Sequence, residues 1–390
     1  MLEASFSVAA LAGLAAPLVL TGAELLARAY FRARGRAWVL APGSKQVLEP
    51  DLEVLPQLEH EVRIEVNEDG ERGRTAPADW SRTFRVLVAG GSAAECYLLD
   101  QETQWPAVLE RQLAAATDAL DSDGVHVGNV ARSLVRCEYV EWMLRATLPR
   151  MPRLDVVVLM VGASDLVAWM ERGCPGDVPR GELRPDVCFA QHDHGPFSAE
   201  RPALRELAKR LERRLRPSIQ RRPRAGKRIA KNRAMRAAAT NWITEVPDAS
   251  PMLAFYEEWL RRTIEAARAH GARVVVARQP WLQREMTPDE RARLWNFGMG
   301  RPYEGEVTTY FDMPVVYELM SQVDEVSARV ARELGVEACE LRSRLDPSFE
   351  TFYDTLHFTP QGAEQVGRLV AQAILHPGSL ERAAESREAA

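Results

Sequence analysis

The stretch from Leu154 to Val161 reads LDVVVLMV and decides the fold class of the chain. Apart from Asp155 it is continuously apolar and rich in β-branched residues, which is the pattern of a strand buried on both faces. Strands of this kind belong to parallel sheets that helices cover on both sides. The stretch therefore predicts the centre of an α/β domain.

Further strand and helix patterns alternate on either side of this stretch. We expect strands at Val62–Val66, Phe84–Ala89, Val125–Val127, Arg273–Ala277 and Val336–Leu341. Helical patterns lie at Trp105–Leu113, Tyr139–Leu148, Phe255–Ala269, Val315–Leu334 and Pro360–Leu375. Ligands of such sheets bind at the carboxyl ends of the strands, which directs attention to Gly90–Cys96, Gly128–Arg136 and Gly162–Leu166.

Composition restricts the function classes. The chain has 390 residues, 46% of them hydrophobic, which is enough to bury a substantial core. Lys+Arg 50 against Asp+Glu 55 gives a net charge of −5, and no nucleic-acid motif is present, so we expect no nucleic-acid partner. The five cysteines lack the spacing of a zinc or redox motif, and His192 and His194 lack an evident set of further ligands, so we expect neither a metal nor a cofactor.

The N-terminus carries a candidate membrane anchor. Ala4 to Ala23 is an uncharged run of about the length that crosses a bilayer as a helix, and four arginines follow it by Arg36. Positive charge lies after the run and not before it, which favours an uncleaved anchor over a signal peptide; an Ala-rich buried helix is the alternative. By the positive-inside rule these arginines would keep the body of the protein in the cytoplasm.

Composition also divides the chain into segments. We expect residues 1–36 to form the anchor and its basic flank, 37–83 a leader, 84–375 the α/β domain and 376–390 a loose tail. The domain contains an insert at about 170–250, which is helical and strongly basic from Arg201 to Arg236. This basic run is expected to be a solvated surface or to lie against anionic lipid headgroups. Cys174 and Cys188 either pair in a disulfide or remain separate thiols.

Ser92 is the first candidate for chemistry. It follows a buried strand through Gly90 and Gly91, and such glycines permit a tight turn that exposes the next side chain at the sheet edge. Ser92 is therefore expected to be a nucleophile or, in the simpler alternative, a helix cap.

Asp354 and His357 are the second candidate. At this spacing a carboxylate can accept the Nδ1 proton of the imidazole and aim Nε2 outward as a general base. A serine hydroxyl is a poor nucleophile without such a base, so the two candidates support each other. The pair could also merely shape the start of the last helix.

In this set of motifs the chain resembles the SGNH (GDSL-type) hydrolases, which are serine esterases and acyltransferases with a flavodoxin-like three-layer α/β/α fold. Three stretches carry the resemblance: VLVAGGS ending at Ser92, LDVVVLMVGASDL from Leu154 to Leu166, and DTLHFTPQGAEQV from Asp354. The resemblance implies a catalytic triad of Ser92, Asp354 and His357. It also implies an oxyanion hole formed by the backbone N–H of Ser92, the backbone N–H of Ala131 and the Ser164 side chain.

Two positions of this hole depart from the family pattern. Ala131 occupies the position of a glycine, or a shifted alignment brings Gly128 there instead. Ser164 stands where the family has an asparagine, and its hydroxyl is a shorter donor. The loss of one donor lowers the rate of such enzymes by about a hundred- to a thousandfold without abolishing it.

We therefore expect a carboxylester hydrolase that acts on acyl or acetyl esters of small molecules or carbohydrates. The alternatives are an O-acyltransferase that modifies a polysaccharide and a catalytically weak binding or assembly module of the same fold. Resemblance to anchored family members and a Cys174–Cys188 disulfide would place the catalytic domain outside the cytoplasm, the opposite side from the one the arginines favour, and we expect the outward location.

Overall fold

A five-stranded parallel sheet forms the centre of the molecule. The computed structural model describes residues 17–31, 37–77, 79–151, 153–181, 185–192, 202–215 and 219–378. The strands are β4 (Thr83–Gly90), β5 (Gly124–Asn129), β6 (Val156–Met160), β10 (Arg273–Ala277) and β12 (Glu337–Cys339), and every neighbouring pair is parallel. All residues of β6 are buried, as the continuous apolar pattern predicts. The α/β class and the parallel sheet predicted from the sequence are confirmed.

The order of the strands fixes where a ligand can bind. From one edge to the other the order is β12-β10-β6-β4-β5, so β4 and β6 lie side by side although β5 separates them in sequence. This is the 2-1-3-4-5 order of flavodoxin-like sheets, in which the chain leaves the first and third strands in opposite directions and opens a crevice between them. The loops after Gly90 and Met160 lie at this crevice.

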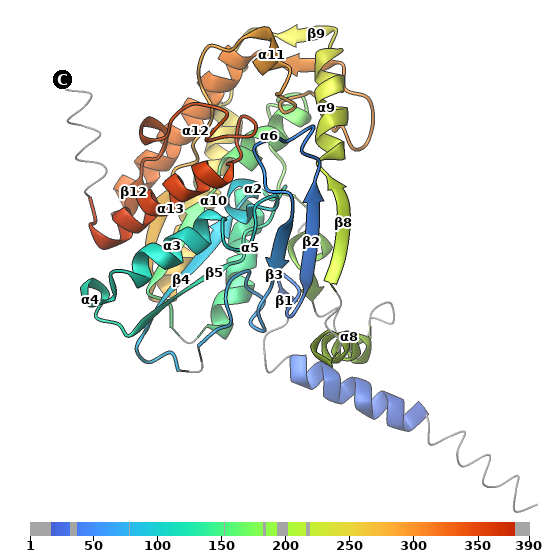
Figure 1. The fold of residues 1–390 in the computed structure, drawn as a ribbon, viewed down its shortest axis with the longest axis vertical. Coiled ribbons are helices and arrows are strands. Elements are labelled where there is room, and N and C mark those ends of the chain that lie inside the picture. Colours follow the sequence, from blue (N-terminus) through green and yellow to red (C-terminus); the bar gives the residue numbers. More distant parts are fainter. Residues whose placement is uncertain are drawn as a thin grey trace, which may run out of the picture.

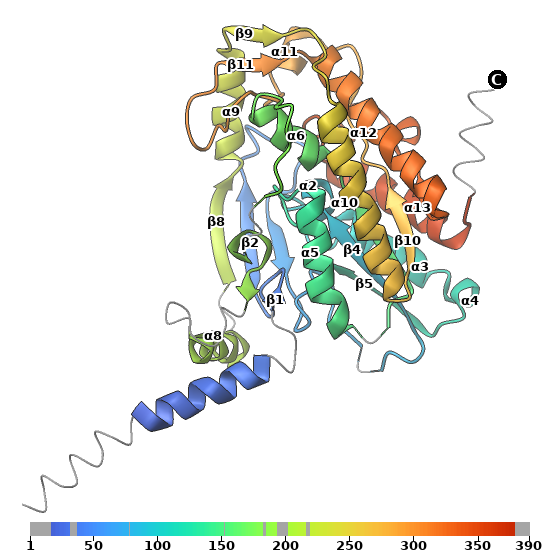
Figure 2. The same cartoon turned by 180° about the vertical axis from the view of Figure 1, so that it is seen from behind.

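Helices cover both faces of the sheet (Figures 1 and 2). On one face α3 (Trp105–Ala114) packs against α13 (Pro360–Leu375). On the other face α10 (Ser250–Ala269) packs against α5 (Cys137–Thr147) and α12 (Met313–Leu334). The α3–α13 approach depends on Gly367, since a Cβ there would lie 2.5 Å from Val108 Cβ.

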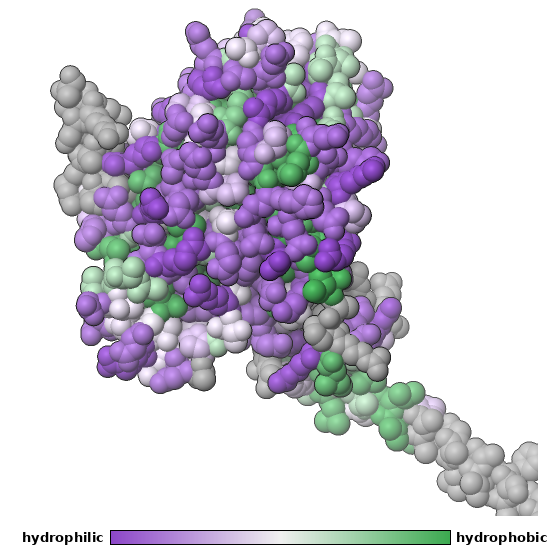
Figure 3. Space-filling model, in the orientation of Figure 1, coloured by the Kyte–Doolittle hydropathy of each residue, from purple (hydrophilic) through white to green (hydrophobic). Residues whose placement is uncertain are grey.

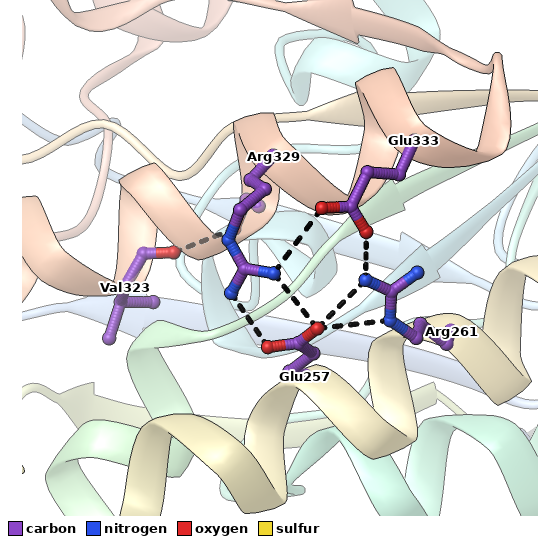
Figure 4. A network of polar contacts seen from close by, with 6 residues as sticks. Glu257, Arg261, Val323, Arg329 and Glu333 are labelled. Atoms are coloured by element: carbon purple, nitrogen blue, oxygen red, sulfur yellow. Dashed lines mark hydrogen bonds and ion pairs between the residues drawn. The ribbon is translucent and has the colours of Figure 1, made fainter. Parts of the chain in front are cut away.

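An ion-pair network joins α10 to α12 at the surface (Figure 4). Glu257 of α10 accepts hydrogen bonds from Arg329 of α12 at 2.6 and 3.0 Å, and from Arg261 one turn along its own helix. Glu333 of α12 completes the network through ion pairs with both arginines. These hydrogen bonds lower the pKa of Glu257 to about 2. The side chains are partly exposed, so the network fixes helix positions more than it adds stability.

A buried cluster of charges lies under the edge strand β5. Glu71 is fully buried and contacts Arg85 of β4 at 3.0 Å and His126 of β5 at 2.9 Å. Burial would raise the pKa of Glu71, but the hydrogen bond from His126 and the charge of Arg85 lower it overall. These contacts therefore join the leader segment to the central sheet. Removal of one partner would leave a buried charge unpaired and would strongly lower the stability of the fold.

A second, three-stranded sheet stands beside the central one. The leader supplies β2 (Lys45–Pro50) and β3 (Val62–Glu65), and the insert supplies β8 (Ile219–Ala225), which pairs in parallel with β2. The insert predicted to be helical thus contains helices and also strands, of which β8 is the longest. The pairing of β8 with β2 joins the leader and the insert into one structural unit.

The other elements are short or peripheral. They are β1 (Ala37–Trp38), α2 (Ser92–Glu95), α4 (Thr117–Leu120), α6 (Ala163–Glu171), α7 (Pro185–Cys188), β7 (Gln191–His192), α8 (Ala203–Leu215), α9 (Lys227–Ala237), β9 (Asn241–Ile243), α11 (Pro288–Arg291), β11 (Thr309–Phe311) and the 3-10 turns Leu148–Arg150 and Arg342–Arg344.

The N-terminal helix is described over residues 17–31. Its Ala27, Arg28 and Phe31 are buried, and Glu24 accepts the backbone N–H groups of Ala203 and Leu204 at the start of α8, each at 2.9 Å. Residues 4–16 of the predicted anchor lie outside the described residues, as do 379–390 of the predicted tail. Within the part of the chain that is described, no helix is both long and apolar enough to cross a bilayer.

Candidate active site

Ser92 lies where β4 meets the crevice. Gly90 has a φ of 156°, and a Cβ there would lie 2.1 Å from the carbonyl oxygen of Met160, so only glycine fits between β4 and β6. Two residues later Ser92 begins α2, a single turn that ends at Cys96 in the left-handed conformation. Arg72 fixes this turn from outside the sheet, since its guanidinium donates to the carbonyl oxygens of Glu95, Cys96 and Leu99. The half-buried Ser92 is thus held on a short, braced turn.

His357 reaches Ser92 from the loop before α13. Its Nε2 lies 2.8 Å from Ser92 Oγ, although 265 residues separate the two in sequence. On the other side of the ring, Nδ1 lies 2.8 Å from Asp354 Oδ2. The structure therefore brings together the three residues that the sequence singles out as a triad.

Asp354 is fixed as firmly as the imidazole it holds. Its side chain is fully buried, and Oδ1 accepts the backbone N–H groups of Leu356 and His357 at 2.8 and 2.9 Å. Its other oxygen, Oδ2, accepts the indole N–H of Trp295 at 2.9 Å. Four donors thus surround one carboxylate, which satisfies the charge that burial would otherwise penalise.

The rings beside His357 restrict its motion. The Trp295 ring is nearly parallel to the imidazole, with centroids 6.4 Å apart, and the Tyr353 ring is nearly parallel to it at 5.5 Å. The His357 side chain remains 14% exposed. The imidazole is consequently oriented by packing as well as by its hydrogen bond, and it still faces the site.

Electrostatics favour the ionic form of the Asp354–His357 pair. Burial would raise the pKa of Asp354, but the charge of His357 and the hydrogen bonds to the carboxylate lower it overall. Burial would lower the pKa of His357, yet the charge of Asp354, its hydrogen bond and the more distant Glu95 raise it above its ordinary value of 6.5. A raised pKa suits a histidine that takes a proton from a hydroxyl and stays protonated beside an anion.

Ser164 lies next to the backbone of the turn that carries Ser92. It belongs to the first turn of α6, which follows β6 at the crevice. A Cβ placed on Gly91 would lie 2.8 Å from Ser164 Oγ, so the hydroxyl fills the space that a side chain at position 91 would need. The structure therefore places the predicted Ser164 donor beside the peptide that precedes Ser92.

Ala131 is less available as a donor. Its N–H already donates to Asn129 Oδ1 at 2.9 Å, and an oxyanion would have to share or displace that bond. Gly128, the alternative alignment, lies inside β5 opposite Leu87, where a Cβ would meet the buried Glu71 carboxylate at 2.4 Å. Of the two, only Ala131 lies beyond the carboxyl end of the strand.

A further set of polar groups at the site was not identified from the sequence. Trp295 holds Asp354 from a loop that carries no motif, so no sequence signal could have found it. Asn129 accepts the Ala131 N–H and donates to the carbonyl oxygen of Ala94. Its position at the carboxyl end of β5, where ligands of parallel sheets bind, is a sequence feature that could have identified it. Glu95, one turn after Ser92, accepts the backbone N–H of Ser133 at 2.7 Å.

The remaining candidate residues lie away from this site. Cys174 and Cys188 do not form a disulfide in this structure, so the disulfide alternative is wrong here. His194 lies outside the described residues, and the described part of the chain contains no group of three or more His, Cys, Asp or Glu side chains placed to hold a metal ion.

No protein-family model and no curated protein matches the chain. Solved structures that it resembles include a putative GDSL-like lipase from Parabacteroides merdae, with a TM-score of 0.41 and 10% identity over 76% of this chain and 98% of that one. A second is a mutant of Axe2, an acetyl-xylooligosaccharide esterase from Geobacillus stearothermophilus, with a TM-score of 0.40 and 14% identity over 75% of this chain and 94% of that one. A third is the acetyl xylan esterase AlAXEase, with a TM-score of 0.39 and 8% identity over 75% of this chain and 100% of that one.

Proposed function

We propose that the protein is an SGNH-type serine esterase that cleaves short acyl esters through an acyl-serine intermediate. The observation that carries the proposal is the contact of 2.8 Å between Ser92 Oγ and His357 Nε2, with Asp354 on the far nitrogen of the ring. Hydroxyl, imidazole and carboxylate in this order form the arrangement that activates a serine.

The mechanism follows from these contacts. His357 Nε2 takes the Ser92 proton as Oγ attacks the ester carbonyl, and Asp354 stabilises the imidazolium that forms. The Ser92 N–H, the Ser164 hydroxyl and, by exchange of its bond to Asn129, the Ala131 N–H stabilise the oxyanion. The alcohol leaves with the proton from His357, and water then attacks the acyl-serine with His357 again as the base.

The immediate surroundings of Ser92 favour a small acyl group. A cavity of about 10 Å³ lies against Ser92 and His357 and is closed by Cys96, Leu98 and Phe358, among others. This space holds at most about one water molecule. Among acyl groups an acetyl methyl group needs the least rearrangement to enter it, whereas a long chain requires the walls to move.

Labelling with a fluorophosphonate tests the proposal. We expect stoichiometric labelling of the full-length protein at Ser92, none of the Ser92→Ala variant, and much slower labelling of His357→Gln. Release of p-nitrophenol from p-nitrophenyl acetate should follow the same order. An unlabelled wild-type protein would reduce the site to a binding or assembly module, and products formed on an added sugar would identify acyl transfer in place of hydrolysis.

We also propose that the N-terminal helix contacts a membrane. Its outer face exposes Leu18, Val19, Leu20, Leu25 and Leu26, of which Leu18 and Leu26 are each 73% exposed (Figure 3). The uncharged run of the predicted anchor leads into this face, which supports contact with lipid. Flotation with vesicles should separate the full chain from a variant that lacks residues 1–31, and protease access in intact cells tests the extracytoplasmic location, which stays a prediction.

A further inference from the structure

A large groove begins one helical turn from Ser92. It has a volume of about 740 Å³ and runs between the sheet of β2, β3 and β8, helix α8 and the loop that follows β5. Glu95, Asn129 and Ala131 line its inner end, and the same groups surround the turn that carries Ser92. The groove is therefore placed to hold a large part of a molecule whose ester lies at Ser92.

Positive charge dominates the lining of the groove. Lys45, Arg72, Arg132, Lys209 and Arg222 line it, against Glu95 and Glu212. Lys45 and Lys209 have acidic neighbours, but Arg132 donates to the carbonyl oxygen of Val39 at 3.1 Å and Arg222 to the hydroxyl of Tyr97 at 3.2 Å. Both of these partners are neutral, and neither guanidinium forms an ion pair with another described residue, so the groove attracts anions even though the whole chain is acidic.

The neutral part of the lining is rich in hydroxyl and amide groups. Ser44, Gln46, Tyr97, Ser133 and Gln220 contribute such groups. Gln46 Oε1 is buried and has no hydrogen-bond partner in the described part of the chain, which leaves an acceptor for a ligand hydroxyl. Leu40, Ile64 and Val66 are among the apolar side chains of the lining, and the apolar share of the lining is about as large as the polar share. A surface of this mixed kind suits a polyhydroxylated chain, because its hydroxyl groups can bind the polar side chains while the carbon faces of its rings pack on the apolar ones.

We propose that this groove binds a carbohydrate chain that bears carboxylate groups and presents its O-acyl ester to Ser92. The inference rests on the proposed function for its chemistry, but the binding itself does not require catalysis. Arg132 and Arg222 pair with carboxylates of the sugar units, while the amide and hydroxyl side chains bind the ring hydroxyls.

Calorimetry on the full-length Ser92→Ala protein tests the binding. The probes are an oligogalacturonate of about six units and a neutral xylo-oligosaccharide of the same length. We expect the oligogalacturonate to bind more tightly, and its affinity to fall as NaCl is raised. Arg222→Gln and Arg132→Gln, each made in this background, should weaken it roughly three- to tenfold. Arg332→Gln removes an exposed charge from α12, away from the groove, and should leave the affinity unchanged.

Three results would overturn the inference: no heat with oligogalacturonate, equal affinity for the neutral oligosaccharide, or equal weakening by Arg332→Gln. Binding to phosphatidylglycerol vesicles that needs Arg222, without binding of oligogalacturonate, would assign the surface to lipid instead. Because binding is measured on the Ser92→Ala protein, the two proposals fail separately. Failed labelling of the wild-type protein would reject the esterase proposal without affecting the proposal that the groove binds an acidic carbohydrate. Normal labelling without sugar binding would reject the groove proposal and leave the esterase proposal intact.

Discussion

The indole N–H of Trp295 donates to Oδ2 of Asp354 at 2.9 Å, the same oxygen that contacts the His357 ring. Trp295 does not line the small cavity beside Ser92, so we expect it to act on catalysis by positioning the carboxylate and the imidazole.

Trp295→Phe removes this donor and keeps an aromatic ring beside His357. A hydrogen bond to a charged group contributes about 1.5 to 3 kcal/mol, and part of that loss should appear in the reaction barrier. We expect kcat on p-nitrophenyl acetate to fall roughly tenfold while KM changes little. The unshared negative charge should also draw the His357 proton more strongly, so the acid limb of the pH profile should move to higher pH. A fall in kcat without that movement would mean a general loss of packing.

The pH dependence of activity should reflect His357. The base must be neutral, and its pKa lies above 6.5, so kcat/KM should rise with pH and reach half its maximum above pH 6.5. Glu95→Gln removes a charge that raises this pKa and should move the midpoint to lower pH. Asp354→Asn should lower kcat by about four orders of magnitude, as in other Ser-His-Asp enzymes. A midpoint that Glu95→Gln leaves in place would exclude electrostatic coupling across the site.

Ser164→Ala tests the oxyanion site. Removal of a donor from such a site costs about a hundred- to a thousandfold in kcat. We expect a loss at the lower end of this range, because a rotating hydroxyl is a less fixed donor than an amide. Ser81→Ala, on the surface, is the control. An unchanged kcat in Ser164→Ala would show that the space beside Gly91 does not receive the oxyanion.

Acyl length should be limited by the cavity at Ser92. One added methylene in a tight apolar pocket changes specificity by roughly ten- to two-hundredfold, so p-nitrophenyl butyrate should be hydrolysed at least about tenfold more slowly than the acetate. Leu98→Ala widens the cavity wall and should reduce this preference. Equal rates for the two esters in the wild-type protein would contradict a closed acyl pocket.

The buried and exposed charges should differ in their effect on stability. Glu71→Ala leaves Arg85 buried without its partner and should lower the free energy of unfolding by about 3 to 5 kcal/mol. Glu257→Ala, in the partly exposed network, should cost no more than about 1 kcal/mol and less in high salt. Since folding lowers the pKa of Glu71, its contribution is complete above its ordinary pKa of 4.5 and is lost as the pH falls through the lower folded value. Denaturant titrations at pH 7 and pH 4 measure these differences.

The central sheet could be predicted because its strands carry their own signal. The apolar runs that end at Ala89, Val161 and Ala277 have no polar face to turn toward solvent, so burial follows from their sequence alone. The predicted ends of β10 and α13 match the structure. Strand β8 could not be predicted, since its sequence IQRRPRA is exposed, lacks alternation and contains Pro223. It exists because β2, far away in sequence, offers it an edge.

The site divides in the same way. Ser92 follows two glycines, and Asp354 and His357 are three residues apart, which limits their geometry. Short sequence motifs therefore reveal all three. Trp295 and Arg72 become part of the site only through the packing of distant segments, and no local pattern marks them.

The span of 265 residues between Ser92 and His357 has a consequence for biosynthesis. When roughly the first three hundred residues have been translated, the nascent chain contains Ser92 but neither His357 nor the helix α13 that follows it. On the proposed mechanism, nascent chains and C-terminally clipped fragments should therefore be inactive toward esters. Ser92 would become reactive only once the segment that carries His357 has docked with α13 against the sheet, so activity would await completion of the fold.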